Sequence, residues 1–125
     1  MKYAQLGTSG MHVSRICLGT MLFGTPRALP ECVRLVSEAM DRGINFFDTA
    51  NVYEVYSRAW GSSGGVAEEI LGTDLEGRRQ KEVICTKIAN PNGVGPDDAD
   101  LSARHLEREL ELSLKRLRTD RIDLG

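Results

Sequence analysis

The sequence predicts an α/β fold with parallel strands, and two observations support this. Short apolar runs rich in β-prone residues alternate with longer segments in which apolar residues recur every three or four positions. Successive runs are separated by roughly the 30 or more residues of a β-α-β unit. A doubly wound parallel sheet is compatible with this pattern. The four runs are residues 16–19, 44–48, 82–87 and 119–125, with three helical segments between them.

Composition limits the class of protein. The chain has 125 residues, a net charge of −2 and 41% hydrophobic residues, which suits one small core. The near-neutral charge argues against a nucleic-acid or membrane-surface role, and no apolar run approaches the roughly 20 residues that span a bilayer. The chain shows no secretion signal at its start and no metal-ligand spacing. Cys17, Cys32 and Cys85 are widely spaced and lie in apolar segments, so we expect reduced, buried thiols in a cytoplasmic protein.

The N-terminal part of the chain predicts a hairpin followed by the first parallel strand. Residues 3–6 and 11–14 flank a turn with two glycines, which is typical of a β-hairpin. Residues 16–19 are expected to form a fully buried strand. Glycines in the next loop, residues 19–24, would let the backbone approach a ligand closely, and a tight strand exit that touches no ligand is the alternative.

The three helical segments each have recognisable boundaries. Pro30 suits the first turn of the first helix and Gly43 its C-terminal stop. The second is centred on residues 66–71, and the third extends from an N-cap at Ser102 to about Arg118. The apolar positions expected to be buried are Cys32, Leu35, Val36, Ala39 and Met40 in the first helix, Val66, Ala67, Ile70 and Leu71 in the second, and Leu106, Leu110, Leu114 and Leu117 in the third.

Polar residues follow two of the predicted strands at their carboxyl ends. Asp48 ends the strand at residues 44–48, and Tyr53 follows in the next loop. Lys87 ends the strand at residues 82–87. Parallel α/β folds keep their chemistry at this end of the sheet, so we expect these three side chains to lie close together.

This set of groups suits the reduction of a carbonyl by hydride from a nicotinamide. The developing alkoxide needs a proton, and a tyrosine can give it if its pKa, about 10 when unperturbed, is lowered. A lysine ammonium beside the phenol lowers that pKa by stabilising the phenolate, and a carboxylate paired to the lysine holds the ammonium in place. Taken singly, an aspartate at a strand end is more often a turn residue, and a lysine more often solvated.

The sequence resembles the aldo-keto reductases along its whole length. Residues 43–53 match the family pattern Gly-Ile/Val-Asn-x-Phe/Ile-Asp-Thr-Ala-x-x-Tyr, and residues 18–24 match Leu-Gly-Thr-x-x-Phe-Gly. Residues 101–106 and 113–124 continue the resemblance. The resemblance implies the N-terminal half of a (β/α)8 TIM barrel with a leading β-hairpin at its bottom, truncated at the end of the fourth strand. Residues 1–125 are therefore expected to form a single, partial aldo-keto reductase domain.

The resemblance also implies an activity and a set of site residues. Asp48, Tyr53 and Lys87 correspond to three members of the family's catalytic tetrad, with Tyr53 as the proton donor. The fourth member, a histidine, follows the last strand by a few residues in the family, and this chain stops before that position, so that the truncated chain is expected to be inactive alone. The expected cofactor is NADPH and the expected substrate a small aldehyde or ketone. The residues expected near the nicotinamide are Gly19, Thr20, Met21 and Asp48.

Three other residues are weaker candidates. Tyr56 competes with Tyr53 but lacks the family's spacing from Asp48. His105 lies in the first turn of the third predicted helix, so we expect a surface or capping residue. His12 belongs to the predicted hairpin and is interpreted as structural.

Several functions other than reduction remain open from the sequence. The family contains potassium-channel β-subunits with similar motifs, which implies an NADPH-binding regulatory subunit as one alternative. A barrel aldolase in which Lys87 forms a Schiff base is another, and an inactive gene fragment is a third. A half-barrel would also have open, apolar sheet edges, which favours self-association.

Overall fold

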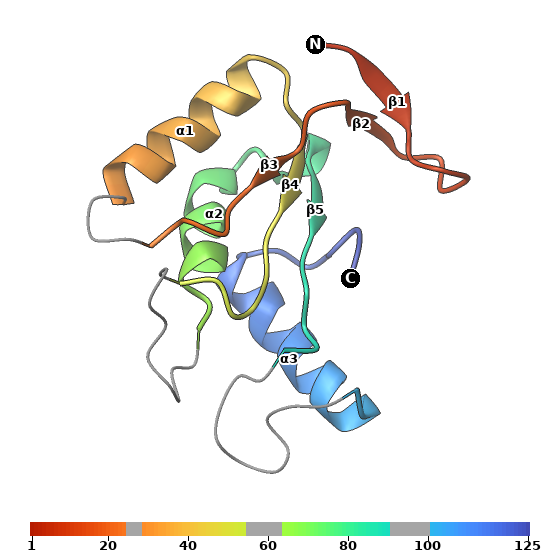
Figure 1. Cartoon of the computed structure of the whole chain (residues 1–125), viewed down its shortest axis with the longest axis vertical. Helices are drawn as coiled ribbons and strands as arrows, with labels where there is room; N and C mark the ends of the chain where they lie inside the picture. The colour runs from red at the N-terminus through yellow and green to blue at the C-terminus, as the bar shows by residue number, and fades with distance from the viewer. Residues whose placement is uncertain (25–28, 55–63, 91–100) are drawn as a thin grey trace.

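The computed structural model describes residues 1–24, 29–54, 64–90 and 101–125. Short strands and helices alternate along the chain, as expected for an α/β fold (Figure 1). The elements are β1 (Tyr3–Gln5), β2 (His12–Ser14), β3 (Leu18–Gly19), α1 (Leu29–Asp41), β4 (Phe46–Asp48), α2 (Val66–Leu75), the 3-10 helix η1 (Arg79–Lys81), β5 (Val83–Cys85) and α3 (Ala103–Arg116).

The central sheet is parallel and has the strand order β3-β4-β5. The predicted fourth strand is present as one parallel bridge, in which Leu124 pairs with Cys85 beside β5. Backbone hydrogen bonds on either side of the bridge join Leu124 N to Ile84 O (3.1 Å) and Thr86 N to Leu124 O (3.1 Å). The predicted parallel arrangement is therefore confirmed, with spatial order equal to chain order.

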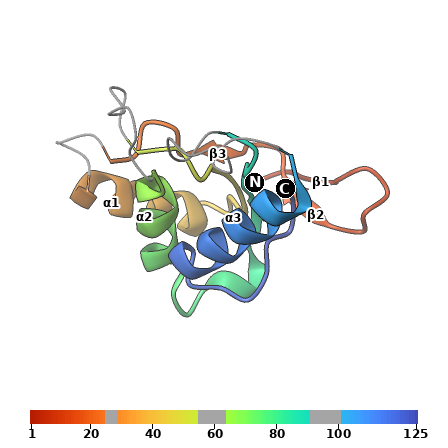
Figure 2. The same ribbon diagram turned by 90° about the horizontal axis from the view of Figure 1, so that it is seen from below.

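Helices α1, α2 and α3 lie together on one side of this sheet (Figure 2). Phe47 of β4 and Ile84 of β5 point toward them and are fully buried, together with Val36 of α1 and Leu71 of α2. Burying these apolar side chains supplies most of the stabilising free energy of such a layer. None of the helices in the described ranges is both long and apolar enough to cross a membrane.

Among the described residues, the opposite face of the sheet is exposed near β3, which corrects part of the sequence prediction. The strand at residues 16–19 was expected to be fully buried, but Ile16 is 57% exposed and Cys17 is also exposed. The helices cover only the face onto which Phe47 and Ile84 point. For the same reason the expectation of three buried thiols is wrong for Cys17, although all three cysteines are free.

The predicted hairpin is confirmed, and it packs at the amino end of β4. Strands β1 and β2 pair antiparallel, and Gly7 and Gly10 in the turn have positive φ. The Tyr3 hydroxyl donates to Gly43 O (2.7 Å), and Asn45 Nδ2 donates to His12 O (3.0 Å). The hairpin therefore lies at the end of the sheet away from the predicted site.

Helix α3 buries only part of the predicted leucine stripe, because Leu117, just after it, is 1% exposed whereas Leu106 and Leu114 are half-buried. Its N-cap is confirmed, because the Ser102 side chain accepts a hydrogen bond from His105 N. However, Leu110 is 39% exposed, whereas His105, Glu109 and Ser113 are buried. This polar face of α3 is buried because it contacts the segments that follow β4 and β5: Glu109 accepts from Asn51, and His105 lies beside Ile88 O. The same kind of error affects α1, where Leu35 was expected to be buried and is 46% exposed.

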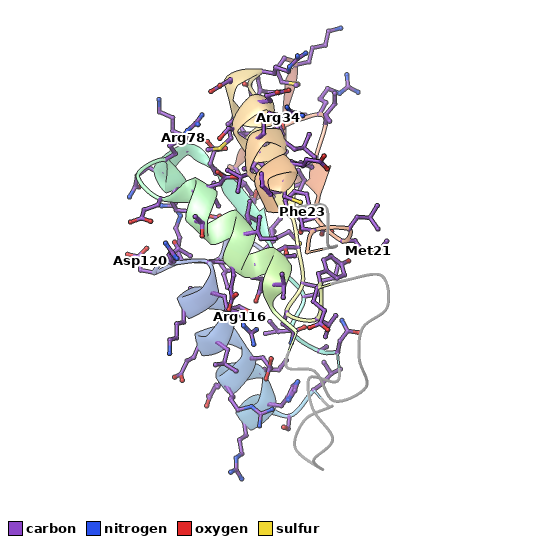
Figure 3. All side chains as sticks on the ribbon, turned by 90° about the vertical axis from the view of Figure 1, so that its left-hand side faces the viewer. Met21, Phe23, Arg34, Arg78, Arg116 and Asp120 are labelled. Carbon is purple, nitrogen blue, oxygen red and sulfur yellow. The ribbon has the colours of Figure 1, made fainter. Side chains whose placement is uncertain are left out.

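A buried ion pair joins α2 to α3. Glu68 of α2 is fully buried and accepts from Arg116 Nη1 (3.2 Å) and from the Thr86 hydroxyl (2.7 Å). Figure 3 shows Arg116 where the two helices meet. Gly72 allows this close packing, because a Cβ there would lie 2.8 Å from Leu117 Cα.

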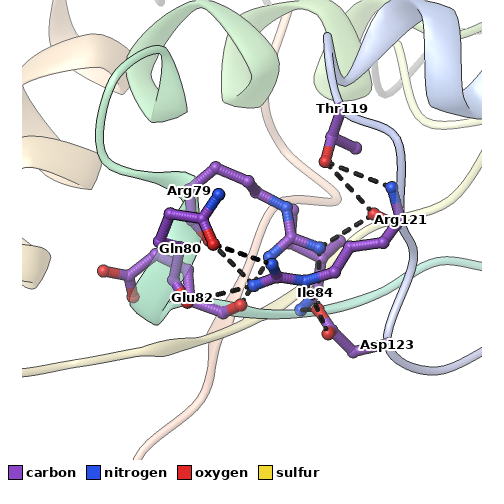
Figure 4. A network of polar contacts seen from close by, with 7 residues as sticks. All are labelled: Arg79, Gln80, Glu82, Ile84, Thr119, Arg121 and Asp123. Atoms are coloured by element: carbon purple, nitrogen blue, oxygen red, sulfur yellow. Dashed lines mark hydrogen bonds and ion pairs between the residues drawn. The ribbon is translucent and has the colours of Figure 1, made fainter.

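A second polar cluster fastens the C-terminal segment to β5 (Figure 4). Asp123 Oδ2 accepts from Arg79 Nη2 (2.7 Å) and from Ile84 N (2.9 Å). Arg79 Nη2 also donates to Arg121 O (2.9 Å), and both partners of the Arg79–Asp123 ion pair are mostly buried. Arg79 of η1 thus holds in place the C-terminal segment that pairs with β5.

We expect Arg116→Met to destabilise the chain strongly, because it leaves Glu68 buried without its cationic partner. Removing one member of a buried ion pair costs about 3–5 kcal/mol. Arg118→Met is a matched control, since Arg118 pairs with Glu76 at the surface and exposed pairs contribute about 0–1 kcal/mol. Urea unfolding measures both. Equal losses for the two variants would contradict the structural role given to the buried pair.

Candidate active site

The structure brings together the three residues predicted to form the site. Lys87 Nζ donates to both carboxylate oxygens of Asp48, each at 2.7 Å, and to Thr49 O at 3.0 Å. The same ammonium lies 5.1 Å from the centroid of the Tyr53 ring. The side chains of Lys87 and Asp48 are 42% and 34% exposed, so the cluster is open to solvent.

Backbone pairing fixes this cluster. Asp48 ends β4 and pairs in register with Cys85 of β5. Past the strands, Thr49 N donates to Cys85 O (2.8 Å) and Asn51 N donates to Lys87 O (3.0 Å). The parallel ladder therefore continues beyond both strands. As a result, Asp48 and Lys87 project from neighbouring positions at the carboxyl end of the sheet.

Tyr53 is held by a turn and by the start of α2. Tyr53 N donates to Ala50 O (3.1 Å), which closes the turn after the extended ladder. Ala67 N, in the first turn of α2, donates to Tyr53 O (2.9 Å). Tyr53 is partly buried against the core. Both sides of its backbone are thus anchored to regular structure.

The surroundings of Lys87 favour its charged form. Burial lowers the pKa of Lys87, but hydrogen bonds and Coulomb attraction to Asp48 and Tyr53 outweigh it, so the net pKa is raised. The pKa of the neighbouring Cys85 thiol is also raised, first by burial and then by the negative charge of Asp48. The ammonium is therefore present at neutral pH, in contact with a carboxylate and a phenol.

The residues expected near a nicotinamide lie beside Asp48, but only some of them are free to contact a ligand. Gly19 pairs with Asp48 across the sheet, and a Cβ there would meet nothing within 4 Å. Thr20 is fully buried, with its N–H and hydroxyl both donating to Asp48 O (2.9 and 3.1 Å). Met21 is 56% exposed and is labelled in Figure 3. Gly19 and Met21 are thus accessible, whereas the polar groups of Thr20 are used by the protein.

The second glycine of this loop approaches the protein's own backbone. Gly24 has φ +91°, and a Cβ there would collide with the carbonyl oxygen of Glu54. Phe23, just before it, is buried in the core beside α1 (Figure 3). This half of the loop is therefore the tight exit that was considered as the alternative.

Two buried groups near the site were missed or misjudged from the sequence. His105 was expected at the surface or as a cap, yet it is 1% exposed and its Nε2 lies 3.2 Å from Ile88 O, close after Lys87. Asn51 is fully buried, and its Nδ2 donates to Glu109 Oε2 (2.8 Å). The i, i+4 spacing of His105 and Glu109 on one helix face was the available signal. Tyr56, the weaker tyrosine candidate, lies outside the described residues.

Metal chemistry gains no support from the described part of the chain. Within those residues, no group of three or more histidine, cysteine, aspartate or glutamate side chains could hold a metal ion.

Comparison with known proteins finds similarity along nearly the whole chain. The sequence model of the aldo/keto reductase family matches residues 15–125. The chain is 46% identical to the uncharacterised oxidoreductase YrpG of Bacillus subtilis, covering 99% of this chain and 39% of the relative. It is 39% identical to a probable voltage-gated potassium channel subunit beta of Oryza sativa, covering 99% of this chain and 36% of that protein.

Solved structures give the same result. An aldo-keto reductase from Bacillus halodurans, in its holo form, superposes with a TM-score of 0.81 at 35% identity, covering 98% of this chain and 38% of that chain. A putative aldo-keto reductase from Pseudomonas aeruginosa gives 0.75 at 39% identity, covering 96% and 43%. The chain therefore spans about two fifths of the length of these relatives, which confirms the partial barrel.

We expect Asp48→Asn to lower the pKa of Lys87, because it removes the hydrogen bond and the Coulomb attraction of Asp48, which oppose the effect of burial. With the folded pKa above its ordinary value of 10.5, the charged lysine contributes stability at lower pH and loses it as pH rises through the folded pKa. The Asp48→Asn variant should lose this contribution of charged Lys87 to the stability of the folded chain. Titration of the Lys87 ε-carbon by NMR measures the pKa directly.

Asp41→Asn is the control for this titration, since Asp41 pairs with Arg78 at the surface away from the site. It should leave the titration of Lys87 unchanged. A Lys87 pKa that is the same in Asp48→Asn and in the parent chain would contradict the electrostatic account of the site.

Proposed function

Because the chain belongs to the aldo/keto reductase family, we propose that its three-residue cluster reduces aldehyde or ketone carbonyls with NADPH. The observation that carries the proposal is the position of the Lys87 ammonium, 2.7 Å from both Asp48 oxygens and 5.1 Å from the Tyr53 ring centroid. An ion pair that served only stability would not need a phenol beside it. Proton transfer to a carbonyl oxygen needs a positioned acid, and the Tyr53 phenol can be that acid.

In the proposed reaction the Tyr53 hydroxyl donates a hydrogen bond to the substrate oxygen and then transfers its proton. The carbonyl carbon accepts a hydride, and the oxygen accepts the Tyr53 proton, so that the product is the alcohol and Tyr53 is left as a phenolate. Lys87 stabilises that phenolate as the proton leaves, and Asp48 keeps the ammonium in place. Solvent then returns a proton to Tyr53, since the cluster is open to water.

NADPH would supply the hydride, and the accessible groups beside Asp48 fit its nicotinamide end. The exposed side chain of Met21 offers an apolar surface, and the absence of a side chain at Gly19 leaves the strand end unobstructed. The Asp48 carboxylate, itself partly exposed, can accept a hydrogen bond from an amide. We further propose a cytoplasmic protein, in keeping with three free cysteines.

A second candidate is an NADPH-binding regulatory subunit. The similarity to two plant proteins described as probable voltage-gated potassium channel beta subunits, at 39% and 38% identity, favours it. Such a protein would use the same cluster to bind the cofactor while turning over little carbonyl substrate. The rate of NADPH oxidation separates the two functions.

The proposed reductase is tested by NADPH oxidation with a panel of small aldehydes and ketones. Tyr53→Phe should lower the rate at least about 100-fold, the lower range for a lost general acid. Tyr3→Phe is the control, because the Tyr3 hydroxyl bonds to Gly43 at the far end of the sheet. NADPH binding without turnover would favour the regulatory subunit, and neither binding nor turnover would contradict both proposals.

Self-association through the open face and edges of the sheet is proposed as well. Ile16 and Met21 are more than half exposed beside the edge strand β3, and exposed apolar sheet surface is prone to pairing. We expect the 13.8 kDa chain to sediment as oligomers, and Ile16→Lys to shift it toward monomer. Leu35→Lys, on the outer side of α1, is the control. A parent chain that stays monomeric would refute this proposal.

A further inference from the structure

A buried polar contact lies directly behind the cluster and has no part in the reaction as proposed. Asn51 stands between Asp48 and Tyr53 in the chain, and its side chain is fully buried. Its Nδ2 donates to Glu109 Oε2 (2.8 Å) on α3, and Glu109 is 1% exposed. A contact between residues so far apart in sequence ties the site loop to a helix that carries none of the three site side chains.

The backbone of Asn51 joins the two segments that continue β4 and β5 beyond their carboxyl ends. Asn51 N donates to Lys87 O (3.0 Å), which holds the loop against the chain that carries the ammonium. The turn from Ala50 to Tyr53 then carries the phenol back toward Lys87. A displacement of Asn51 would therefore alter the separation of Tyr53 and Lys87 without touching either side chain.

We propose that the Asn51–Glu109 hydrogen bond is a positioning pair that holds the Tyr53 ring over the Lys87 ammonium. A buried amide and a buried carboxylate have few alternative partners, so the contact restricts the loop to one arrangement. Glu109 also lies 3.3 Å from Arg108, whose side chain is partly exposed. The importance of this positioning for catalysis rests on the proposed reductase function. The effect of the pair on the placement of the Tyr53 ring does not depend on that function.

The effect can be measured on the full chain without cofactor or substrate. A lysine side chain above an aromatic ring has methylene proton resonances shifted upfield by the ring current. We expect this shift for the Lys87 ε-methylene protons in the parent chain and its loss in Asn51→Ala, with the dispersed methyl spectrum of the core retained. Tyr53→Leu, which removes the ring, should also lose the shift and would thereby show that the Tyr53 ring causes it.

Two further variants separate positioning from stability. Glu109→Gln keeps a hydrogen-bond acceptor and should retain the upfield shift. The double variant Asn51→Ala with Glu109→Met removes both partners, so that neither is left buried and unpaired, and it should fold while lacking the shift. Retention of the upfield shift in the folded double variant would overturn the proposal.

Ser113→Ala is the matched control, because Ser113 is fully buried one turn beyond Glu109 on the same helix. Its hydroxyl has no hydrogen-bond partner in the described ranges, so its removal should leave the Lys87 shift as in the parent chain. Loss of the shift in Ser113→Ala would equally overturn the proposal, since any change on this face of α3 would then suffice. Absence of NADPH turnover in the parent chain would bear on the reductase function and not on this result.

Discussion

The parallel register of β4 and β5 is the constraint on which the site depends. It sets Asp48 opposite Cys85, and the ladder continues past both strands until Asn51 meets Lys87. A shift of one residue would send Asp48 to the helix side of the sheet, because successive side chains point to opposite faces. Phe47, now buried against the helices, would then face solvent. Burial of the core and assembly of the site thus require the same pairing.

Charged groups also contribute to the layer between sheet and helices, where apolar packing is incomplete. Glu68 and Glu109 both lie almost wholly out of solvent, and each contacts a segment that carries a site residue. Thr86, bound by Glu68, directly precedes Lys87. Such contacts have a defined geometry, which apolar packing does not provide. Helices α2 and α3 therefore support the carboxyl end of the sheet at specific atoms.

The parallel strands and the residues of the cluster could be predicted from the sequence, because apolar runs and the polar residues that follow them are local patterns, whereas the half-barrel order of the strands was implied only by the family resemblance. Asp48 and Lys87 each end such a run. The orientation of α3 could not be predicted in this way, because its leucines give an apolar stripe, while the face that is buried depends on loops distant in sequence. His105 was misjudged for that reason, since the group it meets, Ile88 O, lies beyond a different strand.

The fastening of the C-terminal segment to β5 has a consequence for how the chain folds during synthesis. Each parallel strand lies beside the one made before it, and the last segment is held by Arg79 and Ile84, which precede it by some 40 residues. During synthesis, each described strand after β3 therefore finds its neighbour in the central sheet already made, and this sheet can grow by addition at one edge. Among the described strands, none has to be inserted between two that are already paired.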